Sequence, residues 1–142
     1  LLFLDVGLVN YHMGIQENFL NLDDLNNFYR GRIAEQVVGQ NIIAQFMDSP
    51  PKLLYWAKKK PEGCAEVDFC LNRMGNILGI EVKSGKSNRL KSLFSFGSSV
   101  EHGHLIRIYS GELKKEEMKI GNKNSILVSI PFYLVPRILE SF

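Results

Sequence analysis

The chain has 142 residues, which is the size of one domain with one hydrophobic core. Its composition, 45% hydrophobic and 23% charged, is ordinary for a folded domain, and no apolar run is long enough to cross a bilayer as a helix. The net charge of +2 is too small to indicate a nucleic-acid partner by itself. These numbers exclude a chain that spans a membrane through an apolar helix, and we expect no membrane partner.

The chain opens on an apolar run, Leu1–Leu4, without the basic leader of a signal peptide. We therefore expect residues 1–28 to be a linking segment left from a longer chain, and residues 29–142 to form the domain. Cys64 and Cys70 fall in one predicted strand, roughly 20 Å apart, which is too far for a disulfide. We therefore expect two reduced, buried thiols in a cytoplasmic protein.

The first half of the chain predicts two helices. Leu4, Leu8 and Tyr11 have helical spacing, which favours a short helix after Asp5. Residues 16–27 are polar and predict a connector. Residues 27–47 are the strongest helix candidate, because apolar residues recur along one side: Ile33, Val37, Val38, Ile42, Ala44 and Phe46.

Glu35 lies in line with the apolar residues of that helix, where a carboxylate is costly unless it is paired or bound to metal. One interpretation is a site residue. The other is a glutamate at the edge of the apolar stripe, with its head in water or paired with Arg32. The residues alone favour the second.

The second half predicts mainly strands. We expect strands at 52–57, 64–71, 77–84, 104–109 and 125–130, a turn at 58–63 and a helix at 87–97 that Ser87 or Asn88 caps. Residues 111–124 are charged and predict an irregular segment, and Pro131 opens a short terminal helix.

The strands 64–71 and 77–84 carry the chemistry. Because side chains alternate between the two faces of a sheet, Glu66 and Asp68 should share one face, and Val67 and Phe69 the other. Gly75 lies in the short segment between the strands, so they should pair as an antiparallel hairpin.

In the second strand, Glu81 and Lys83 should share a face, with Ile80 and Val82 on the other. Asp68, Glu81 and Lys83 would then lie side by side. Carboxylate oxygens suit Mg²⁺ or Mn²⁺, and a lysine beside the metal can orient water for phosphodiester hydrolysis. The alternative is a structural ion-pair patch, which contributes only about 0–1 kcal/mol when exposed. The position inside two apolar strands favours a site.

These residues also carry a resemblance. Glu66–Phe69 and Ile80–Lys83 resemble the D…E-x-K signature of the PD-(D/E)XK, or restriction-endonuclease-like, superfamily. The chain more specifically resembles the C-terminal domain of uncharacterised prokaryotic AAA+-type ATPases. Five motifs occur in the order found there: Leu4–Leu8, Gly31–Glu35, Leu54–Trp56, Glu66–Phe69 and Glu81–Lys86.

The resemblance implies an α/β fold with a restriction-endonuclease-like core, a mixed central sheet of four to five strands flanked by helices. It implies a metal-dependent nuclease-like domain acting on DNA. Asp68, Glu81 and the Val82 carbonyl would hold Mg²⁺ or Mn²⁺, Lys83 would orient the water, and Glu35 would complete the acidic cluster.

The resemblance also implies a helper residue, phosphate contacts and a partner domain. Glu66 would be a helper, and the phosphates would contact Lys58, Lys59, Lys86 and Arg89. An ATPase domain would precede this one in the chain and would be the only binder of ATP. The alternative is a catalytically silent DNA-binding or regulatory module of that ATPase, because fold does not imply function.

Three other motifs are weaker. Five residues separate Gly79 from Gly85 where a P-loop has four, so a nucleotide loop is excluded. His102 and His104 lack the cysteines or the helical spacing of a zinc site, and loop histidines are the better interpretation. Tyr55 and Trp56 either stack on bases or belong to the core.

Overall fold

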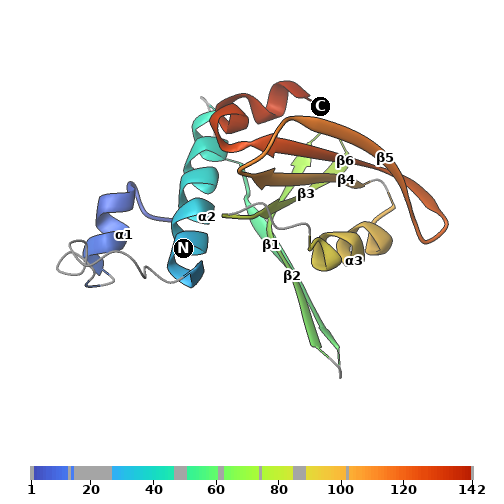
Figure 1. Ribbon diagram of the computed structural model, residues 1–142, viewed down its shortest axis with the longest axis horizontal. Coiled ribbons are helices and arrows are strands. Elements are labelled where there is room, and N and C mark those ends of the chain that lie inside the picture. The colour runs from blue at the N-terminus through green and yellow to red at the C-terminus, as the bar shows by residue number, and fades with distance from the viewer. Residues whose placement is uncertain are drawn as a thin grey trace.

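A computed structural model describes residues 2–12, 14, 27–46, 51–60, 63–73, 75–84, 89–101 and 103–141. For residues 27–30, 60, 63, 103 and 141 it describes only the backbone. In this part of the chain, six strands form one mixed sheet in the order β1-β2-β3-β4-β6-β5 (Figure 1). The α/β class with a mixed sheet is as predicted, but the sheet is larger than the four to five strands expected.

The elements follow the predicted order with shifted ends. The helices are α1 (Val6–His12), α2 (Asn27–Ala44), α3 (Lys91–Ser99) and the 3-10 helix η3 (Phe132–Ser141). The strands are β1 (Leu54–Lys60), β2 (Gly63–Arg73), β3 (Asn76–Val82), β4 (Gly103–Tyr109), β5 (Lys114–Ile120) and β6 (Lys123–Pro131).

The sheet combines two antiparallel ribbons with a parallel centre. Strands β1, β2 and β3 pair antiparallel, β3 pairs parallel with β4, and β4 pairs parallel with β6. Helix α3 is the crossover between β3 and β4, the connection that a parallel pair requires. The far end of the β1–β2 hairpin extends well beyond the rest of the sheet (Figure 1).

Helices pack on both faces of the sheet and define two apolar clusters. Helices α2 and η3 cover one face through Val38, Ile42, Val135 and Ile138. Helix α3 covers the other face through Leu93 and Phe96. Alternation in the central strands supplies both clusters, because Ile106 and Ile108 face α2 while Leu105 faces α3. Both faces of the parallel centre are therefore buried, as parallel sheets require.

Three expectations about local structure are wrong. Residues 114–120 form the edge strand β5 and are not irregular, since exposed charges on an edge strand prevent further pairing and hide the apolar alternation. Lys58 and Lys59 extend β1 where a turn was expected. Helix α3 begins at Lys91, and its N-cap is Leu90, with no side-chain cap. Ser87 and Asn88 lie outside the described residues, as do 15–26 of the predicted connector.

The N-terminal segment is attached to α2 through its backbone. The buried side chain of Gln36 accepts a hydrogen bond from Phe3 N (3.1 Å) and donates one to Phe3 O (2.6 Å). Asp5 Oδ1 accepts from Leu8 N (2.9 Å) and starts α1, as its sequence position predicts. Because of these bonds, Leu2 and Phe3 lie beside the middle of α2.

The cysteines are both free, with Cys64 exposed and Cys70 buried. The prediction of unpaired thiols is confirmed, but the expectation that both are buried is wrong for Cys64. Burial raises the pKa of the Cys70 thiol to about 11. Among the described helices, none combines the length and the apolar character needed to cross a bilayer.

Candidate active site at the fork between β2 and β3

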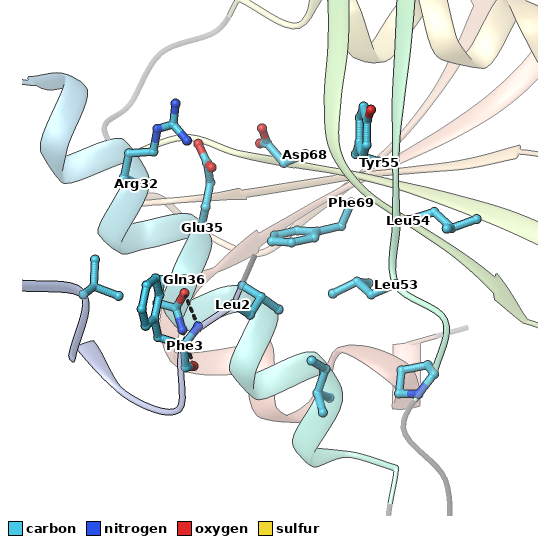
Figure 2. Close-up of a pocket in the computed structure, with 13 residues that line it drawn as sticks. Leu2, Phe3, Arg32, Glu35, Gln36, Leu53, Leu54, Tyr55, Asp68 and Phe69 are labelled. Carbon is cyan, nitrogen blue, oxygen red and sulfur yellow. Dashed lines mark hydrogen bonds between the residues drawn. The ribbon is translucent and has the colours of Figure 1, made fainter. Parts of the chain in front are cut away.

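A β-bulge in β2 places Asp68 at the site. The register with β1 runs from Leu54–Cys70 to Trp56–Val67, so Asp68 and Phe69 both lie opposite Tyr55. As a result, Val67 packs in the cluster under α3 while Phe69 packs in the cluster under α2. The expectation that Val67 and Phe69 share a face is therefore wrong. The extra residue turns both Asp68 and Phe69 towards α2, where they line one cavity (Figure 2).

The two central strands separate directly after this bulge. Pairing between β2 and β3 ends at Phe69–Ile80, whereas β3 stays paired with β4 as far as Val82–Ile108. Val82 N, which has lost its partner strand, donates to Asp68 Oδ2 at 2.7 Å. Asp68 thus occupies the fork between the strands, and the acidic groups meet there and not on one flat face.

Glu81 and Lys83 form the other side of the fork. Lys83 Nζ donates to Glu81 Oε1 at 2.6 Å, and the side chains are 27% and 8% exposed, respectively. Glu81 Oε2 is buried and has no hydrogen-bond partner, which makes it the one such side-chain atom in the described part of the chain. A buried carboxylate oxygen without a partner is costly, so Glu81 lowers the stability of the folded protein at this position.

Glu35 reaches the same place from α2. Its carboxylate and that of Asp68 face each other from helix and strand, with Arg32 beside them (Figure 2). Burial raises the pKa of Glu35, and the charge of Asp68 raises it further, while Arg32 and Lys83 act to lower it. The apolar stripe of α2 therefore does carry Glu35 inward, and Arg32 lies close enough for its charge to act on Glu35.

All three carboxylates have raised pKa values, primarily because burial disfavours the charged form. The pKa of Glu81 rises to about 6, with the charge of Asp68 as the second cause and that of Glu35 as a smaller one. For Asp68 the bond from Val82 N and the charge of Lys83 partly oppose the rise. These mutual effects mean that Glu35, Asp68, Glu81 and Lys83 form one electrostatic cluster.

The donor set fits Mg²⁺ or Mn²⁺ in part. In the described part of the chain, no three His, Cys, Asp or Glu side chains gather closely enough to form a complete cage. Magnesium usually takes only one or two protein carboxylates and keeps several waters. The unpartnered Glu81 Oε2, the Asp68 carboxylate and the Val82 carbonyl are hard oxygen donors of that kind.

The remaining predicted residues lie around this cluster. Glu66 is exposed on β2, and its charge raises the pKa of Asp68 slightly. Lys58 and Lys59 are exposed on the projecting part of β1, and Arg89 is exposed before α3. Lys86 lies outside the described residues.

Sequence reasoning missed two features of this site. Arg32 was treated only as a partner for Glu35, yet it lines the cavity beside Glu35 and Asp68. The bulge opposite Tyr55 leaves no signal in the sequence pattern, because it depends on how β1 and β2 pair. Trp56, by contrast, belongs to the core: its ring meets Phe96 edge-on at 5.7 Å.

The fold and site together define an α/β protein with an acidic cluster and one lysine at a fork in its sheet. Residues 30–133 match the family described as a domain of unknown function (DUF4143), and the chain belongs to this family. Such domains are typically found with AAA-type ATPases. No curated protein matches the chain.

Proposed function

We propose that this protein is a metal-dependent nuclease domain of the restriction-endonuclease type, acting on DNA phosphodiesters beside an ATPase module of the same chain. The observation that carries the proposal is the fork, where the charge of Asp68 raises the pKa values of Glu35 and Glu81 near Lys83 and one buried carboxylate oxygen lacks a partner. Three carboxylates with raised pKa values in one place are expected where a cation is to be bound.

In this proposal, Asp68 and Glu81 hold Mg²⁺ or Mn²⁺ with the Val82 carbonyl, and Glu35 adds negative charge from α2. The bound cation would neutralise the phosphate and lower the pKa of a water. Lys83 donates to Glu81 Oε1 at 2.6 Å. It orients the attacking water or donates to a phosphate oxygen, because an ammonium cannot be a metal ligand.

One observation favours a second candidate, a catalytically silent DNA-binding or regulatory module. Lys83 already neutralises one oxygen of Glu81, and the described residues offer no complete metal cage. An ion pair that only replaces a former metal would have this geometry. The exposed Lys58, Lys59 and Arg89 fit either candidate, since phosphate contacts require no chemistry.

A pair of variants tests the proposal in the full-length protein, with plasmid nicking and calorimetric titration of Mn²⁺ as readouts. Lys83→Ala should lower nicking by about a hundredfold or more and leave Mn²⁺ affinity nearly intact. Asp68→Asn should weaken Mn²⁺ binding itself. The matched controls, Lys119→Ala and Glu116→Gln, change exposed charges on β5 and should alter neither readout. Wild-type levels of nicking by Lys83→Ala would refute the mechanism, and the absence of nicking by the wild type with every metal tested would support the silent module.

A further inference from the structure

A cavity of about 810 Å³ adjoins the acidic cluster on the side of α2. Arg32, Glu35 and Asp68 line it together on one side, and apolar side chains that include Leu2, Leu53 and Phe69 line the rest (Figure 2). The volume falls within the range of about 300–1,000 Å³ that is usual for sites of small organic groups. A largely apolar cavity with a few polar groups at one end favours a flat, partly polar ligand.

We infer that this cavity receives the base of an unpaired nucleotide whose phosphate lies at the acidic cluster, which makes single-stranded DNA the substrate class. The inference rests on the proposed function for the position of the phosphate. The phosphate and the base belong to the same DNA strand, so their two binding places must adjoin. The acidic cluster and the cavity do adjoin, because they share Glu35 and Asp68.

The strongest single feature is Tyr55. Its side chain is 76% exposed although it lies in a β-strand, and it lines the cavity. The bulge puts it directly opposite Asp68 and Phe69, a position where facing side chains are about 5 Å apart. An exposed tyrosine at the rim of an apolar cavity is a stacking surface for a base, and such stacking tolerates any sequence.

The part of β1 beyond Tyr55 offers a further contact for a DNA strand. Alternation places Tyr55, Ala57 and Lys59 on one side of β1, with Lys59 about 13 Å beyond Tyr55. Lys59 is exposed, so it can contact a neighbouring phosphate of a strand that runs along the hairpin. Bases within a duplex are already stacked and cannot enter the cavity without being unpaired. Single strands are therefore preferred.

The test is fluorescence anisotropy of the full-length protein in Mn²⁺ with a labelled oligonucleotide of hydrolysis-resistant phosphorothioate linkages, so that the cation is bound and cleavage does not intervene. The wild type should bind the single strand more tightly than the duplex of the same sequence. Tyr55→Ala should weaken single-strand binding by about tenfold or more, and Tyr55→Phe should restore it, because the ring and not the hydroxyl is required. Tyr133→Ala, which removes a tyrosine that is 77% exposed on η3, should have no effect.

An oligonucleotide with abasic positions separates stacking from phosphate contacts. It should bind the wild type as weakly as the normal oligonucleotide binds Tyr55→Ala. Equal binding by wild type and Tyr55→Ala, equal affinity for duplex and single strand, or unchanged binding of the abasic oligonucleotide would each overturn the inference. If the protein binds single strands through Tyr55 but never cleaves DNA, the proposed nuclease activity is refuted and the base site remains. If it cleaves DNA equally well without Tyr55, the base site is refuted and the nuclease activity remains.

Discussion

Two buried charged residues lie side by side in the centre of the sheet and differ in how their polar groups are satisfied. Glu81 of β3 pairs in register with Arg107 of β4, and they are 6% and 7% exposed. Arg107 donates from Nε to Ser129 Oγ at 3.1 Å, and its guanidinium lies 4.1 Å from the centre of the Tyr109 ring. Glu81 has one oxygen bound to Lys83 and one without a partner.

The difference fits a structural role for Arg107 and the role proposed above for Glu81. Arg107 is surrounded by the groups that a buried guanidinium needs, an acceptor and an aromatic face, so it stabilises the fold. Glu81 lies where β2 has separated from β3, and its second oxygen has no hydrogen-bond partner. Burial raises the pKa of Glu81, and under the proposed function a bound cation would compensate this cost.

The largest expected effect is the opposite response of the two positions to neutral substitutions of similar size. Glu81→Gln should lower metal-dependent nicking by about a hundredfold or more while the free energy of unfolding at pH 7 stays equal or rises. Arg107→Met should keep nicking and lower the free energy of unfolding by about 1–3 kcal/mol, because Ser129 loses a buried donor. Urea denaturation and plasmid nicking give both readouts. If Glu81→Gln lowers the free energy of unfolding and leaves nicking normal, Glu81 has a structural role and the comparison is reversed.

The second effect is a pH dependence that Glu81 should impose on stability. Its pKa is about 6 in the folded protein against an ordinary value of 4.5, so the folded state favours the protonated form. The resulting stabilisation is fully present below pH 4.5 and is lost as the pH rises through 6, by about 2 kcal/mol. The raised pKa values of Glu35 and Asp68 act in the same direction.

Urea denaturation at pH 5 and at pH 7 measures this effect. Glu81→Gln should flatten the loss of stability between the two pH values, and Glu116→Gln, an exposed carboxyl on β5, should keep the wild-type slope. If the free energy of unfolding changes equally between pH 5 and pH 7 in all three proteins, Glu81 is not the titrating group.

The smallest effect concerns the environment of Arg107. Ser129→Ala should lower the free energy of unfolding by about 1 kcal/mol, since the Nε of Arg107 loses an acceptor in a fully buried position. The exposed ion pair of Arg137 with Glu140 is the comparison, and Arg137→Ala should cost less than about 1 kcal/mol. Thermal unfolding of both variants resolves the difference, and an equal loss from the two would weaken the structural role given to Arg107.

Local sequence was sufficient for most elements and for the composition of the site. Helix α2 begins at the predicted residue because its apolar stripe is long, and the central strands were recognised from β-branched and aromatic residues. The pair Asp68 and Glu81 with Lys83 was identified because carboxylates and a lysine inside apolar strands are costly. Strand β5 was missed because an edge strand exposes both faces and shows no apolar alternation.

The geometry of the site depended on pairing between strands that are distant in the sequence. The bulge that turns Asp68 and Phe69 to the same side, and the fork that leaves Val82 N to bind Asp68, exist only because β1 and β3 hold β2 in different registers. The burial of Arg107 likewise depends on Ser129 of β6. The sequence by itself determined which chemical groups this protein has, since residue type and local periodicity are encoded position by position. Only the tertiary structure decided which of those groups meet and which oxygen stays without a partner, because long-range pairing and burial are properties of the whole sheet.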